Sequence, residues 1–184
     1  MPVPPFVAGQ VLTAAQLNLG VYKVASATAA GTATTLQVNS CFSADWRHYR
    51  ILISGSSATA GVLTLQLSAS GTAATTSYYW NEVLRDCGAT PTNTVSSGAG
   101  STSSFRCGRL NNGSLLATSN IVIDVLDPYV AYPTGFTSMN SYNGGSSYSI
   151  LGSHYSGASY DGFKLTGAGN LTLDVSVYAF EGGA

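Results

Sequence analysis

Apolar and polar residues alternate along the chain from Val21 onward, and Gly, Ser, Thr and Asn clusters separate the alternating runs. A period of two places every second side chain on the same face of a strand, which is the pattern of a half-buried β-strand. The sequence therefore predicts about nine short antiparallel strands. The clearest runs are 49–53, 63–68, 121–126 and 171–177, and the weaker ones are 21–25, 35–38, 78–84, 105–110, 148–151 and 163–165.

The first twenty residues have a different pattern, which predicts a short capped helix. Thr13 and Gln16 form a T-x-x-Q capping box, and Leu12 with Leu17 occupies the positions of a hydrophobic staple. Gly20 then provides the C-terminal stop. Because so short a helix is unstable in isolation, we expect it to dock on its own domain or on a neighbour.

The pattern as a whole predicts an all-β fold, an antiparallel two-sheet sandwich of jelly-roll type preceded by a short N-terminal helix. The predicted division is an N-terminal segment, 1–20, and a β-sandwich domain, 21–184. The stretch 88–104, rich in Gly, Ser and Thr, is predicted to be a mobile loop. The stretch 128–148, rich in Tyr, Asn, Ser and Gly, has the composition of a binding loop.

Charged residues make up only 8% of the 184 residues, while 25 Ser, 19 Thr and 21 Gly supply an uncharged polar surface. With 7 basic and 8 acidic residues the chain lacks the positive field that nucleic-acid binding requires. Its apolar runs are far shorter than the roughly 20 residues that span a bilayer, and no secretory signal is expected. Such a neutral surface, with few Lys or Pro residues to guard sheet edges, favours burial in an oligomer.

The three cysteines, Cys41, Cys87 and Cys107, cannot all pair within one chain. A bridge, if one forms, would join Cys87 and Cys107, although synthesis in the cytosol favours reduced, buried thiols. The spacing of cysteines and histidines contains no close two-ligand motif, so neither a metal nor another cofactor is expected.

The segment from Pro5 to Asn18 resembles the opening module of tailed-bacteriophage virion proteins, which reads approximately F-x-x-G-x-x-L-T-A-x-x-L-N. The matching residues are Phe6, Gly9, Leu12, Thr13, Ala14, Leu17 and Asn18. The run from Trp46 to Ile53 is also similar to an aromatic and basic strand of phage minor structural proteins.

The resemblance implies a minor tail or tail-fibre-type protein, localised to the virion and assembled in the cytoplasm of the bacterial host. It implies that Phe6, Leu12, Thr13 and Leu17 anchor the chain to other virion proteins, and that the chain forms a homotrimer. The chain has no shaft sequence between this module and the predicted sandwich, which favours a compact knob or spike over a long fibre. A capsid decoration or head-fibre protein that needs no ligand is the alternative.

The sequence offers little for catalysis, and no enzymatic activity is expected. Two pairs of acids, Glu82 with Asp86 and Asp124 with Asp127, have the residue types of a glycosidase, but sequence alone does not set their separation. The simpler interpretation is that these are solvated acids at strand ends or turns, paired with Arg85, Arg106 or Arg109. His48 reads as a structural residue of a strand and His154 as a loop contact, and neither belongs to a recognisable nucleophile motif.

Tyrosines concentrate between residues 129 and 160, where their rings could stack on the apolar faces of sugars. Amides and hydroxyls in the same stretch could bond sugar hydroxyls. The alternative is that these tyrosines pack in the core or in a subunit contact. The candidate residues for binding a host cell-surface polysaccharide are Tyr129, Tyr132, Tyr142, Tyr148, Tyr155, Asn140 and Asn143.

Overall fold

The computed structural model describes residues 20–86, 92–113, 118–142 and 146–180. These residues form thirteen strands in two antiparallel sheets and no helix. The prediction of an all-β, two-sheet fold is thereby confirmed, whereas the predicted N-terminal helix lies outside the described residues. None of the described residues forms a helix long and apolar enough to cross a membrane.

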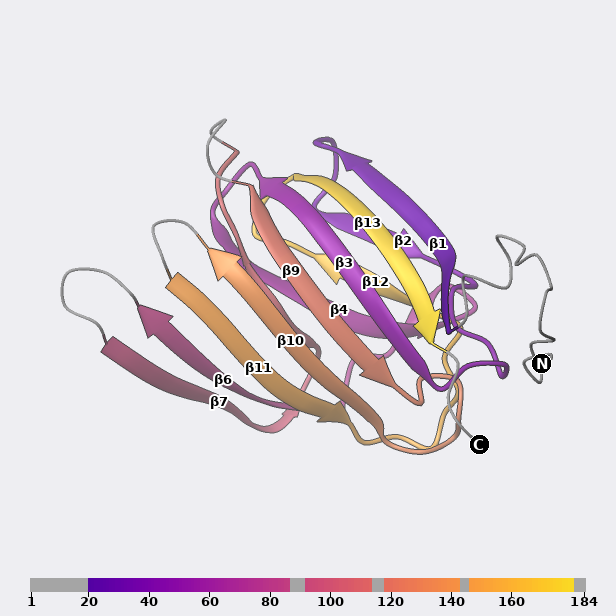
Figure 1. The fold of residues 1–184 in the computed structure, drawn as a ribbon. Coiled ribbons are helices and arrows are strands. Elements are labelled where there is room, and N and C mark those ends of the chain that lie inside the picture. The colour runs from indigo at the N-terminus through magenta and orange to yellow at the C-terminus, as the bar shows by residue number, and fades with distance from the viewer. Residues whose placement is uncertain (1–19, 87–91, 114–117, 143–145, 181–184) are drawn as a thin grey trace, which may run out of the picture.

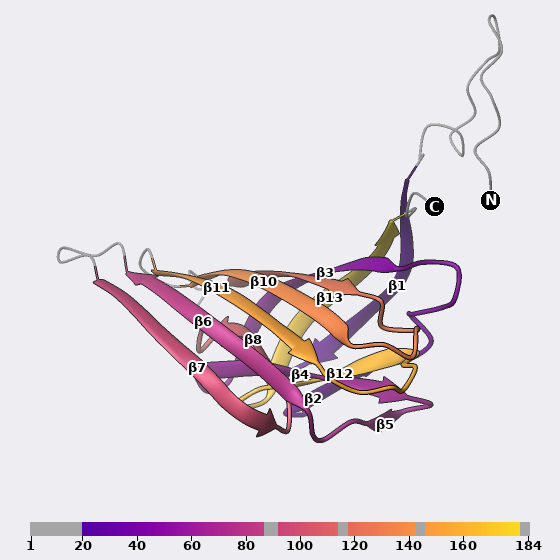
Figure 2. The ribbon, with the colours of Figure 1, turned by 90° about the horizontal axis from the view of Figure 1, so that it is seen from below.

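The larger sheet has eight strands and occupies the front of the view in Figure 1. Its strands, in spatial order, are β1 (Val21–Ala30), β13 (Leu171–Phe180), β3 (His48–Ser57), β9 (Ser119–Leu126), β10 (Thr134–Tyr142), β11 (Ser146–His154), β6 (Tyr78–Asp86) and β7 (Thr92–Thr102). The second sheet lies behind it, as Figure 2 shows, and the two layers give a sandwich-like fold. Its strands are β2 (Thr35–Val38), β12 (Gly162–Thr166), β4 (Gly61–Ala69) and β5 (Thr72–Ala73), with β8 (Phe105–Leu110) paired to β4.

The core lies between the two sheets and consists of the alternating apolar positions of the predicted strands. In β3, Tyr49, Ile51 and Ile53 are buried, while the residues between them face outward. Strands β4, β9 and β13 repeat this pattern. Each apolar side chain that leaves water stabilises the fold by roughly 1.5–3 kcal/mol, so the period-two pattern is the main determinant of this architecture.

Strand β8 connects the two layers. One edge of its backbone pairs with β4, and groups on its other edge form hydrogen bonds with side chains of the larger sheet. The Ser138 hydroxyl donates to the carbonyl of Cys107 at 2.6 Å, and the Asn140 carboxamide oxygen accepts from the Arg109 N–H at 2.9 Å. Gly108 lies between these two positions, and a Cβ there would stand 3.1 Å from Asn140. Two side chains of β10 therefore take the place of a neighbouring strand.

The structure corrects two predicted loops. The stretch 88–104 contains strand β7, which pairs with β6 as an edge of the larger sheet, and 128–148 contains β10, a central strand. Strand β7 gives no alternating signal because most of its residues are Ser, Thr or Gly, and it is recognised by the pairing of its backbone with β6. Strand β10 is concealed because its inward positions include Ser138 and Asn140, whereas the apolar Met139 faces outward.

Cys41 and Cys107 are free and buried. The Cys107 thiol donates to the carbonyl of Leu63 at 3.2 Å, and its free state excludes the considered bridge to Cys87, which itself lies outside the described residues. Burial raises the pKa of Cys41 to about 12 and also raises the pKa of Cys107. Both groups therefore stay protonated and unreactive at neutral pH.

Candidate binding surfaces

Two of the seven predicted glycan-binding residues have buried side chains. Tyr148 is 5% exposed, and the Arg109 guanidinium lies 5.5 Å from the centre of its ring. Asn140 is 3% exposed, and its amide nitrogen donates to the carbonyls of Asn120 and Ser141. Its carboxamide oxygen accepts the hydrogen bond from the Arg109 N–H of β8. Both side chains therefore hold the layers together and leave little surface for a ligand, so their burial argues against the predicted role in glycan binding.

Three of the predicted tyrosines gather at one end of the molecule, on the loops 127–133 and 155–161. We call these two loops the tyrosine end. Tyr132 and Tyr155 are 68% and 70% exposed, and Tyr129 is 38% exposed. The loops are joined by a hydrogen bond from the Tyr160 N–H to the Pro128 carbonyl at 2.9 Å. A backbone bond from Asp127 to Arg47 and another from Tyr155 to Ser77 fix them further.

The other predicted residues do not join this group. Tyr142 is the last residue of β10, so it stands at the opposite end of the sheet from Thr134 and the loop that precedes it. Asn143 lies outside the described residues, and so do the predicted anchoring residues Phe6, Leu12, Thr13 and Leu17. The predicted set is therefore not one site, because strand β10 carries its two halves to opposite ends.

The point where the N-terminal segment joins the sheets lies at the same end as the exposed tyrosines. Val21 is in register with Phe180, which pairs with His48, and His48 pairs with Leu126 directly before the loop 127–133. Three strand spacings separate Val21 from Leu126, or about 14 Å. In Figure 1, β1 begins beside the arrowhead of β13, at the same end of the sheet as the arrowhead of β9.

Beneath the tyrosine end, His154 is buried, which corrects its interpretation as a loop contact. It is 2% exposed and lies between two aromatic rings, with its ring centroid 4.3 Å from that of Tyr78 and 5.2 Å from that of Tyr160. Its Nδ1 has no hydrogen-bond partner among the described residues, and the same is true of Oγ1 of Thr134, its partner in register. Burial lowers the pKa of His154, and a hydrogen bond with the Thr76 backbone opposes this effect only in part.

Acidification should destabilise the fold through His154. Its folded-state pKa lies below its ordinary value of 6.5, so the unfolded chain binds the proton more tightly. Stability from the neutral ring is therefore complete above pH 6.5 and is lost as the pH falls toward the folded-state pKa. Thermal unfolding between pH 5 and 8 should show a steeper loss for the natural chain than for His154→Gln. His48→Gln serves as the matched control. Equal slopes for the natural chain and for His154→Gln would contradict this assignment.

The acids considered for catalysis are paired with arginines wherever their side chains are described. Glu82 is buried and lies 2.8 Å from Arg106, whose guanidinium stands 5.6 Å from the centre of the Trp80 ring. Asp127 pairs with Arg47. Asp124 pairs with Arg50. The acids are therefore paired with arginines as expected, but Arg106 is the one predicted partner among them, and Glu82 is buried rather than solvated.

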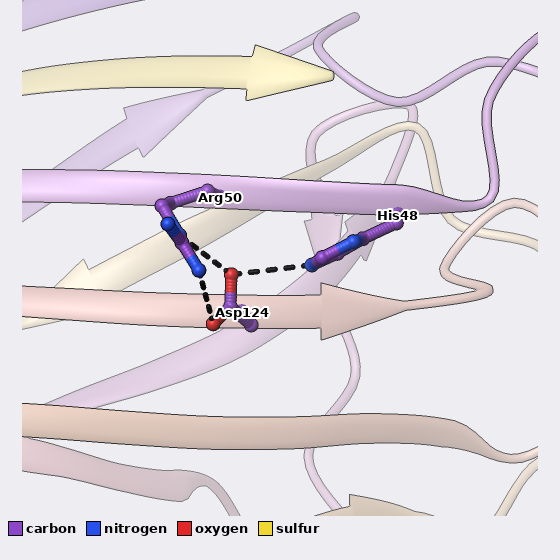
Figure 3. A network of polar contacts seen from close by, with 3 residues as sticks. All are labelled: His48, Arg50 and Asp124. Carbon is purple, nitrogen blue, oxygen red and sulfur yellow. Dashed lines mark hydrogen bonds and ion pairs between the residues drawn. The ribbon is translucent and has the colours of Figure 1, made fainter. Parts of the chain in front are cut away.

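Three residues on the outward face of the larger sheet form a polar network that the sequence did not reveal (Figure 3). Two nitrogens of Arg50 contact the two carboxylate oxygens of Asp124 at 2.8 and 3.0 Å, and His48 Nε2 lies 3.2 Å from one of them. The imidazole stacks on Phe180 at 4.7 Å. Burial raises the pKa of Asp124, but the hydrogen bonds from Arg50 and His48 outweigh it and the pKa is lowered. The i, i+2 spacing of His48 and Arg50 was the available signal, but their partner lies 74 residues further on.

The same outward face carries a shallow hollow of about 770 Å³ over β9, β10 and β11. Its walls include Val122, Met139 and Leu151 with the charged Arg50, Asp124 and Arg85. A second hollow lies beside it over β3. Its walls come from β9, β3 and β13 and include Leu52 and Tyr178. No aromatic ring is exposed in the larger hollow, so it lacks the platform on which a sugar ring would stack.

No cluster of three His, Cys, Asp or Glu side chains that could hold a metal ion occurs among the described residues. Comparisons of the chain with protein-family models, with curated proteins and with solved structures gave no match.

Proposed function

We propose that this chain is a non-enzymatic structural protein of a tailed-phage virion, of minor tail or spike type, whose β-sandwich binds glycan on the host surface. The observation that carries the glycan part is the presence of three exposed tyrosines on adjoining loops of one end, Tyr129, Tyr132 and Tyr155. The opening motif, from Phe6 to Asn18, supports the virion part. The pairing of the candidate acids with arginines supports a role without catalysis.

Glycan binding at this end would rest on stacking. Exposed tyrosine rings offer flat apolar surface at low entropic cost, and the loops around them are held by backbone hydrogen bonds. One such contact is weak, so the proposal includes a homotrimer, in which several weak sites act together. Two finer points belong to the same proposal: a jelly-roll arrangement of the sheets, and a short helix within residues 13–20 that docks on the particle.

A capsid decoration protein is the second candidate, and one specific observation favours it. The N-terminal segment joins β1 at the tyrosine end. If residues 1–20 attach to the particle, they hold the exposed tyrosines close to it. In that case Tyr132 and Tyr155 would contact neighbouring virion proteins and would need no glycan.

One pair of assays on one double variant separates the two candidates. We expect the full chain with Tyr132→Ala and Tyr155→Ala to lose at least tenfold in affinity for host cell-wall or capsule polysaccharide in a pull-down. Because both side chains are mostly exposed, the unfolding temperature should stay within about 2 °C of that of the natural chain. Incorporation into particles should also be unchanged.

Two other outcomes would contradict parts of the proposal. Loss of incorporation, with no polysaccharide bound by either chain, would replace the glycan role by decoration. A chain without residues 2–20 serves as the control, since it should fold and fail to join particles. Normal incorporation of that shortened chain would contradict the anchoring role of Phe6, Leu12, Thr13 and Leu17.

A further inference from the structure

The outward face of the larger sheet carries an apolar patch at its centre. We call it the central patch, and it consists of Leu52, Val122, Met139 and Leu151, on four adjacent strands. Met139 and Leu151 are 68% and 61% exposed. Neighbouring inward positions of β10 hold the polar Ser138 and Asn140, so the strand exposes its apolar residue and buries its polar ones. A patch of this kind marks an interaction surface.

The charges around the central patch are arranged in a self-complementary way. Arg50 and Asp124 neutralise each other within the chain. Arg85 on β6 and Asp174 on β13 are exposed, and neither has an ion-pair partner within the described part of the chain. They stand on opposite flanks of the patch, about 24 Å apart across five strand spacings.

Arg85 and Asp174 also lie on one row of paired residues that crosses the sheet. The register runs from Asp174 through Ser54, Asn120, Ser141 and Ser147 to Arg85 without a shift. A cyclic arrangement repeats one contact between successive copies, so the Asp174 flank of one copy can meet the Arg85 flank of the next.

We propose that copies of this chain assemble around an axis parallel to β9 and β10, with the outward faces of their larger sheets turned toward the axis. Val122 and Met139 then lie nearest the axis, and Asp174 of each copy pairs with Arg85 of the next. The two hollows beside β9 receive apolar side chains of the neighbour. The partner is a second copy because the part of the face between β13 and β6 balances Arg50 and Arg85 with Asp124 and Asp174, and is therefore complementary to itself.

The size of the face allows a contact of modest area. The face between β13 and β6 measures about 24 Å by about 23 Å, or about 550 Å², which is about two thirds of the roughly 800 Å² that each partner contributes to an interface of standard size. A cyclic arrangement about this axis also places Gly20 of every copy at the same end, as joint attachment to one particle requires. The order of three rests on the proposed function; the interface itself rests on the central patch and its flanking charges.

The test measures the mass of the full chain in solution by light scattering over a range of concentrations. We expect a trimer for the natural chain. Arg85→Asp and Asp174→Arg should each weaken association at least tenfold, because each places like charges opposite one another. The double variant that carries both changes should associate as the natural chain does, since the pair is restored with its signs exchanged. Met139→Lys should give a folded monomer, whose unfolding temperature no longer depends on protein concentration.

Lys164→Glu, a matched charge reversal on β12 of the other sheet, should leave the mass unchanged. A natural chain that is monomeric at every concentration would overturn the proposal, and so would an oligomer that ignores Met139→Lys and both single reversals. Failure of the double variant to recover would overturn the Arg85–Asp174 pairing. Incorporation and polysaccharide binding of the natural chain are measured separately, so failure of the interface is distinguishable from failure of the proposed function.

Discussion

Replacing Asn140 by alanine should lower the free energy of unfolding by about 3 kcal/mol. The side chain accepts a hydrogen bond from the Arg109 N–H and donates to the carbonyls of Asn120 and Ser141. Alanine fills none of these roles, so three backbone groups lose a partner and β8 loses half of its bonding to β10. For a chain of this length the unfolding temperature should fall by roughly 6–12 °C.

Asn81 provides the matched control. It is an asparagine on β6 of the same sheet, but it faces outward and is exposed. Asn81→Ala should change the unfolding temperature by no more than about 2 °C. An equally small change for Asn140→Ala would show that its hydrogen bonds do not support β8, and the link between the two layers would have to be assigned elsewhere.

A single added methyl group at Gly152 should also destabilise the fold, by about 3 kcal/mol. A Cβ at this position would stand 2.5 Å from the backbone oxygen of Tyr79 and 2.7 Å from the ring of Phe105. Neither can move easily, because Tyr79 lies in the neighbouring strand β6 and Phe105 stacks on Phe136 with ring centroids 4.7 Å apart. Chemical denaturation of Gly152→Ala, compared with the natural chain, measures this loss.

Gly157 offers the corresponding control, since a Cβ there would meet nothing within 4 Å. Gly157→Ala should be neutral or slightly stabilising, because alanine restricts the unfolded chain. If the two variants unfold at the same denaturant concentration, the close packing of β11 against Phe105 is not a determinant of stability.

Some of the strands that these predictions concern were predicted from the sequence, and others were not. Strands β3, β4, β9 and β13 were predicted because each places apolar residues at every second position on the inward face. Their burial depends on local alternation alone. Strand β10 was missed because its inward Ser138 and Asn140 are buried by bonding to β8, a segment about thirty residues away along the chain.

The candidate site likewise contains residues whose exposure the sequence predicted and residues whose burial it did not. The exposure of Tyr129, Tyr132 and Tyr155 agrees with the loop composition from which they were predicted. Tyr148 and Asn140 have the same residue types but lie inside, because the period of two turns them toward β8. Composition identifies side chains that could contact a sugar, but the direction of each one depends on the strand that carries it.

The sequence by itself determined the all-β class, the position of the clearest strands and the neutral, sparsely charged surface, because these follow from period and composition along the chain. Only the tertiary structure decided that β10 and β7 are strands, that the exposed tyrosines share one end with Gly20, and that Arg85 and Asp174 lie on one row of paired residues, on opposite flanks of the central patch. The physical reason is strand pairing. The backbone register joins residues that are distant in the chain, and no local pattern encodes which strands become neighbours.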